Sequence, residues 1–126
     1  MVKLRTKERK LLYPESFSTT EEINPHWERI LSHIESMNEN DWRLAILEAD
    51  IMLSGLLDNL GLPGDTIGDK LKAVEKSDFL SVDRAWEAHK IRNLIAHEGI
   101  SFSLNQREAR RVIELYRIVF EEFQMI

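Results

Sequence analysis

One short segment holds most of the side chains that could do chemistry in this sequence. His89, Asn93 and His97 follow one another at four-residue spacing, and Arg92 stands directly before Asn93. On a helix, residues four positions apart lie in one row. An imidazole can take up or release a proton near neutral pH, and a guanidinium presents a fixed fork of N–H donors. Because the chain has no cysteine, thiolate metal sites and cysteine nucleophiles are excluded, and the chemistry narrows to histidine and arginine.

The spacing of Arg92 and His97 predicts that one chain cannot easily bring both groups onto one atom. At 100° per residue, the two side chains point about 140° apart on an unbroken helix. A second copy across a two-fold axis would bring His97 of one chain near Arg92 of the other, since such an interface repeats each residue on both sides.

Other candidate sites are poorer. His26 and His33 are seven residues apart with no acid between them in their row, so we expect no metal site and no cofactor. Glu48 and Asp50 belong to a segment that should pack near the Arg92 segment. We expect them to pair with Arg or Lys, with a catalytic role as the alternative.

The elements that must position these residues are helices. A helix is expected from Asn24, with Pro25 at its first position, and a second from the N-cap Asn40 to Gly61. A short third helix is expected around residues 67–74, a fourth from the cap Ser81 to Glu98, and a fifth from Ser103 with a Ser-x-x-Gln capping box. The predicted fold is all-α, a four- to five-helix up-and-down bundle.

The fourth helix, residues 81–98, is predicted to be apolar on two sides. Ala88, Ile91, Leu94 and Ile95 form one face, expected in the core, and Val82, Ala85, Trp86 and Ala96 lie opposite among His89, Arg92, Asn93 and His97. Such a helix is either central in its own bundle or lies at a dimer surface or cleft. On the second reading, His89 and Trp86 are interface or auxiliary site residues.

Composition agrees with one small helical domain. The chain has 126 residues, 43% hydrophobic and 31% charged, and its Gly and Pro content is low. The net charge is −5, but residues 1–10 hold five basic side chains and one acidic. We therefore expect a basic, flexible N-terminal arm over residues 1–20 and the helical domain over residues 21–126. No run approaches the ~20 apolar residues of a membrane span and no secretory signal is visible, so a cytoplasmic location is expected. A second basic cluster is either a solvated surface or a footprint for a polyanion, and it consists of Arg84, Lys90, Arg92, Arg107, Arg110 and Arg111.

The segment Arg92-Asn93-Leu94-Ile95-Ala96-His97 resembles the Arg-x4-His signature of the HEPN superfamily, with a polar residue directly after the arginine. The motif lies late in a helix, ends before a glycine and is followed by one more amphipathic helix, which is the order expected of that family. The resemblance covers about residues 24–124. It implies a HEPN-like helical domain that dimerises through the motif helix and, in catalytic members, cleaves RNA without a metal.

On this resemblance, the protein is expected to be an endoribonuclease that belongs to a toxin–antitoxin or defence system, with an antitoxin protein as partner in the first case. His97 would serve as general base or acid, Arg92 would hold the phosphate, and Asn93 would orient the imidazole or donate to a phosphate oxygen. Many HEPN-like domains are instead binding or scaffold dimers, and Glu98 places a carboxylate beside His97. A non-catalytic dimeric domain is the alternative.

Overall fold

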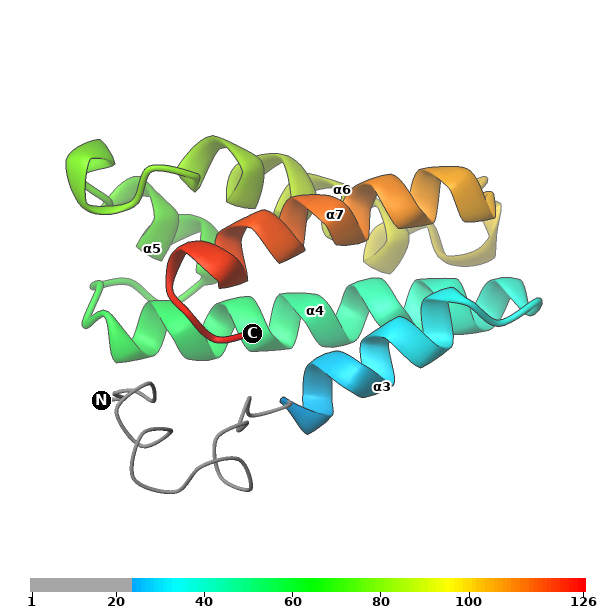
Figure 1. The fold of residues 1–126 in the computed structure, drawn as a ribbon. Helices are drawn as coiled ribbons and strands as arrows, with labels where there is room; N and C mark the ends of the chain where they lie inside the picture. Colours follow the sequence, from blue (N-terminus) through cyan, green and yellow to red (C-terminus); the bar gives the residue numbers. More distant parts are fainter. Residues whose placement is uncertain (1–23) are drawn as a thin grey trace, which may run out of the picture.

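The structure, a computed structural model, describes residues 24–126, and the expected basic arm over residues 1–20 lies outside them. The described chain contains five α-helices and no strand: α3 (Pro25–Ile34), α4 (Glu39–Asn59), α5 (Ile67–Lys72), α6 (Val82–Glu98) and α7 (Gln106–Glu122). Short 3₁₀ turns, η1 (Lys76–Asp78) and η2 (Gly99–Ser101), precede and follow α6. The four long helices run alternately in opposite directions, which confirms the all-α bundle (Figure 1).

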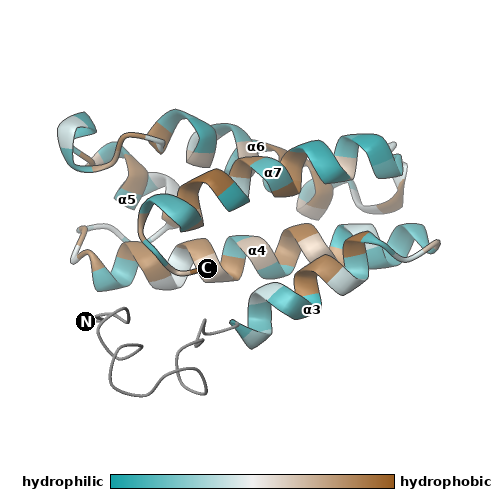
Figure 2. Ribbon diagram, in the orientation of Figure 1, coloured by the Kyte–Doolittle hydropathy of each residue, from teal (hydrophilic) through white to brown (hydrophobic). Residues whose placement is uncertain are grey.

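The core lies between α4, α6 and α7, with α3 packed on α4. Tyr116 and Phe120 of α7 are fully buried, and the ring of Phe120 meets Trp27 of α3 edge to face, with 5.7 Å between centroids. In Figure 2, α3, α4 and α7 each carry both hydrophobic and hydrophilic residues. Among these helices, α4 contacts all of α3, α5, α6 and α7. α4 is therefore the central support against which the other helices pack.

Capping residues fix where the helices begin, and two of them differ from the prediction. Asn24 caps α3 as expected, its side chain accepting from the amides of His26 and Trp27. α4 is capped by Asn38 rather than Asn40, and α7 by Asn105 rather than Ser103. In the second case Gln106 is drawn away from a capping box, because its amide donates to the carbonyls of Ile34 and Ser36.

α6 begins at Ser81 as expected, but the cap comes from another helix. Ser81 makes no side-chain capping bond of its own. The Glu122 carboxylate of α7 accepts from the Leu80 amide at 2.7 Å, the Ser81 amide at 2.8 Å and the Ser81 hydroxyl at 2.5 Å. Burial raises the pKa of Glu122, but these donors outweigh it and hold the pKa below its usual value. A tertiary contact thus satisfies the start of the helix that carries the candidate motif.

Replacing Glu122 with glutamine is expected to lower the free energy of unfolding by about 1–2 kcal/mol at pH 7. Since the pKa is depressed by folding, the stabilisation is complete above the pKa of the unfolded carboxyl and is lost as pH falls through the folded value. Urea unfolding of wild type and Glu122→Gln at several pH values should show their difference narrowing in acid. Glu121→Gln is the control, because Glu121 makes only an exposed ion pair with Arg117. A difference that stays constant with pH would contradict the charged cap.

No helix between residues 24 and 126 combines the length and the apolar character needed to cross a bilayer.

Candidate functional site

α6 carries the candidate residues near its C-terminal end, and its orientation in the bundle decides which of them face inward. Ala85, Ala88, His89 and Ile95 are buried, whereas Leu94, expected in the core, is 44% exposed. Val82 and Ala85, assigned to the opposite side, lie in the core instead, because α6 packs against α5 as well as α4 and α7. The predicted inward face was therefore partly wrong, and α6 buries Val82 and Ala85 within its own bundle while Leu94, Ala96 and His97 stay exposed.

Asp50 of α4 faces this inward side of α6 and contacts three side chains, those of Tyr116, His89 and Arg92. The Asp50 carboxylate is 1% exposed. It accepts from the Tyr116 hydroxyl of α7 at 2.7 Å and lies 3.0 and 3.2 Å from His89 Nδ1. Arg92 Nε is 3.5 Å from Asp50 Oδ2 and makes no hydrogen bond of its own, so this contact is a charge pair. A buried carboxylate needs such partners, because burial without them disfavours its charged form.

Asn93 joins the other side of the same cluster. Arg92 Nη1 donates to Asn93 Oδ1 at 3.1 Å, and Asn93 Nδ2 lies 3.3 Å from His89 Nε2. Since the Asn93 oxygen faces Arg92, its amide nitrogen donates to His89 Nε2. The ring proton of His89 is then on Nδ1, directed at Asp50. These contacts close a ring of four side chains, the Arg92 ring, which consists of Asp50, His89, Asn93 and Arg92. The predicted site residues His89, Arg92 and Asn93 all belong to it.

Tyr116 completes the cluster from α7. Burial raises the pKa of Tyr116 well above its ordinary value, and the neighbouring Asp50 charge and hydrogen bond raise it further. Its hydroxyl therefore stays protonated and remains a donor to Asp50. Tyr116 recurs at helical spacing with the apolar residues of α7, which predicts burial but not this role. A sequence signal for a buried acid with partners was Asp50 itself. It recurs at helical spacing with Ile46, Leu53 and Leu57, which are buried in α4.

His97 stands apart from the ring. It is exposed in the last turn of the unbroken helix α6, and its imidazole makes no hydrogen bond or ion pair with any of residues 24–126. Arg92 turns toward α4, so within one chain the structure separates the two ends of the Arg-x4-His spacing. This is the geometry that the helical spacing predicts.

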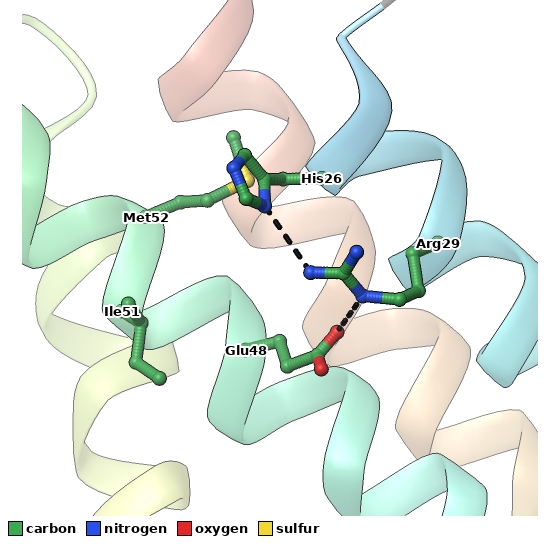
Figure 3. A pocket seen from close by; sticks show the side chains of 5 residues that line it. All are labelled: His26, Arg29, Glu48, Ile51 and Met52. Carbon is green, nitrogen blue, oxygen red and sulfur yellow. Dashed lines mark hydrogen bonds and ion pairs between the residues drawn. The ribbon is translucent and has the colours of Figure 1, made fainter.

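Glu48 and Trp86 lie away from the Arg92 ring. Glu48 Oε1 pairs with Arg29 Nε of α3 at 3.3 Å and lies 3.9 Å from His33 Nε2. Figure 3 shows Glu48 and Arg29 in a shallow pocket with His26, Ile51 and Met52, on the α3 side of α4. Of the two acids proposed as partners of the motif helix, only Asp50 contacts it.

Trp86 is half-buried against α5. A Cβ added to Gly68 would lie 3.9 Å from the Trp86 ring, and Lys90 Nζ lies 6.0 Å from the ring centroid. Trp86 is thus mainly a packing residue between α5 and α6, while part of its surface stays open to solvent.

Most of the basic cluster on α7 is neutralised. Arg110 pairs with Glu35 at 2.9 Å, and Arg111 pairs with Glu87 at 2.7 Å and Glu108 at 2.9 Å. Among residues 24–126, Arg107 has no such partner. The surface of α7 is thus closer to a solvated ion-pair network than to a bare positive patch.

An apolar strip on the outer side of α4 lies between the side that faces the ring and the side of the Glu48 pocket, which Ile51 lines. Leu44, Leu47 and Ile51 recur at three- and four-residue spacing and so share one side of the helix. Leu44 is 38% exposed and Ile51 69% exposed. Asp50 is about 60° round the helix from Leu47, so the strip and the ring occupy adjacent sides of α4.

No group of three or more His, Asp or Glu side chains within the described residues comes together as a metal site would need. No protein-family model, curated protein sequence or solved structure matches this chain. Function must therefore be argued from the arrangement of Arg92, Asn93, His97 and their neighbours.

Proposed function

We propose that this protein is a metal-independent endoribonuclease of HEPN type that acts as a homodimer. The observation that carries the proposal is the state of Arg92. Its guanidinium is anchored by the buried Asp50, yet 35% of its side chain remains exposed. An arginine held by a buried carboxylate and still open to solvent is prepared to receive an anionic group such as a phosphate.

The reaction uses the residues in complementary roles. The 2′-hydroxyl of RNA attacks the adjacent phosphorus, giving up its proton to a base, and the bond to the 5′-oxygen breaks as that oxygen receives a proton. His97 takes or supplies one of these protons, and Arg92 stabilises the added negative charge on the phosphate oxygens, with Asn93 beside it. The products are a 2′,3′-cyclic phosphate and a 5′-hydroxyl.

A second copy completes the site. Because His97 and Arg92 point about 140° apart on α6, His97 of one copy meets Arg92 of the other across a two-fold axis. The strip of Leu44, Leu47 and Ile51 next to the ring supports this arrangement, since a second copy would cover apolar surface there. We propose that the protein acts on RNA in the cytoplasm.

Incubation of the purified protein with single-stranded RNA in EDTA tests the activity. Cleavage is expected, with cyclic phosphate and 5′-hydroxyl ends on the products. Intact RNA, or cleavage that requires an added divalent metal, would refute the proposed reaction.

Replacing Ile51 with lysine is expected to shift the protein from dimer to monomer and to lower cleavage in proportion to the dimer lost, because a charge in an apolar contact must be desolvated. Light scattering after size exclusion measures the mass, and the RNA assay measures the activity. Leu80→Lys is the matched control, since Leu80 is also 69% exposed but precedes α6 at its other end. A dimeric, active Ile51→Lys would exclude the strip from the interface.

A non-catalytic dimer that binds a protein or serves as a scaffold is the second candidate. The pairing of Arg110 and Arg111 with glutamates favours it, as does Glu98 beside His97, because both reduce the positive potential that RNA would meet.

If the protein is the toxin of a toxin–antitoxin pair, its expression should arrest growth and His97→Ala should relieve the arrest. An equally toxic His97→Ala would argue against RNA cleavage as the cause.

A further inference from the structure

Asp50 is the one acidic side chain among residues 24–126 that is buried. It contacts Tyr116, His89 and Arg92, which come from two different helices. A surface acid could leave its partners with little cost, but a buried carboxylate holds its positive partner strongly because water does not screen the pair. Asp50 is thus built into the core at the point from which Arg92 extends toward solvent.

The ring restrains Arg92 at two places. Asp50 Oδ2 attracts the buried Nε at 3.5 Å, and Asn93 Oδ1 accepts from Nη1 at 3.1 Å. The Asn93 amide is itself oriented by His89, whose Nδ1 faces Asp50. Both restraints therefore lead back to Asp50, one directly and one through His89 and Asn93.

We propose that Asp50 is the positioning residue of the site, which acts through Arg92 and does not itself touch RNA. This inference rests on the proposed ribonuclease function. A long arginine side chain loses much rotamer freedom when it is held in place, and here the protein has arranged that before RNA binds. His89 is a positioning residue in the same way, because its two imidazole nitrogens contact Asp50 and Asn93.

Asp50→Asn tests the role in cleavage, because asparagine keeps the size of the side chain and removes its charge. In the otherwise wild-type chain we expect kcat/KM to fall by about 10- to 100-fold. In an Arg92→Ala chain, adding Asp50→Asn should change the residual cleavage by less than about 2-fold, since residues that act through one another are not additive. An equal loss in both chains would overturn the proposal.

Glu122→Gln distinguishes a loss of cleavage caused by lower stability from one caused by the missing Asp50 charge. It weakens the opposite end of α6 and makes no contact with the Arg92 ring. Each variant is assayed at a temperature where circular dichroism shows it folded. If Glu122→Gln and Asp50→Asn lowered cleavage equally, Asp50 would be only structural.

Proton exchange at Arg92 Nε gives a readout that does not depend on RNA. In ¹⁵N NMR of the full chain, the Nε–H proton of wild type should exchange slowly, because the atom is buried against Asp50, and should exchange faster in Asp50→Asn. Fast exchange in wild type would overturn the proposal even if the variant failed to fold. Slow exchange in a wild type that cleaves no RNA would instead refute the ribonuclease function and leave the restraint of Arg92 established.

Discussion

Replacing His97 with alanine is expected to lower the rate of RNA cleavage by about 10²- to 10⁴-fold, the range that general acid–base catalysis by one side chain contributes. His97 is exposed and free of partners within residues 24–126, so its removal should leave the stability nearly unchanged. The combination of a large loss of activity with an unchanged unfolding midpoint identifies a residue that works on the substrate.

His26→Ala is the matched control for that measurement. His26 is also exposed, but it lies at the start of α3 beside Arg29, on the other side of α4. The His26→Ala variant should cleave RNA at the wild-type rate. Wild-type cleavage by His97→Ala would remove the catalytic assignment and favour the binding or scaffold dimer.

Replacing Asp50 with alanine is expected to lower the free energy of unfolding by about 2–4 kcal/mol, because it removes a buried acceptor and leaves the buried Nε of the partly exposed Arg92 without its counter-charge. Tyr116 and His89 would also lose the acceptor that their donors now use. Chemical unfolding followed by circular dichroism measures the change.

Asp58→Ala on the same helix provides the comparison. Asp58 pairs with Lys70 at 2.6 Å, but its side chain is 60% exposed, so the expected loss is no more than about 1 kcal/mol. Similar losses of unfolding free energy for the two variants would mean that the buried contacts of Asp50 stabilise the fold no more than an exposed ion pair does.

The sequence predicted the helices well where one periodic stripe faces one core. The Asn24 cap of α3 appears in the structure as expected, and the apolar residues that recur at helical spacing along α7 are buried. The errors lie where a helix contacts several neighbours or where a cap comes from afar. Leu94 is exposed because α6 turns His89 and Arg92 toward Asp50 instead. Met37 continues the helical spacing of Ile30 and Ile34, but it falls after α3 and is 90% exposed.

The candidate site was predicted in part. The row of His89, Asn93 and His97 and the separation of Arg92 from His97 both follow from helical spacing, and the structure preserves them. Asp50 was one of two acids expected to pair with Arg or Lys near the motif helix, and its helical spacing with the buried residues Ile46, Leu53 and Leu57 is the signal that distinguishes it from Glu48. Asp50 and Glu48 are two residues apart, so a helix turns them about 160° away from each other, one toward α6 and the other toward α3.

The sequence by itself determined the helical fold, the absence of cysteine chemistry and the presence of an Arg and a His at a spacing that one helix cannot close. These depend on residue type and on local periodicity, which a chain carries before it folds. Only the tertiary structure decided that Arg92 is joined to Asp50, that Tyr116 supports that carboxylate and that Glu122 caps α6. Those contacts join residues about 40 to 70 positions apart, so they exist only once helix packing has brought α4, α6 and α7 together.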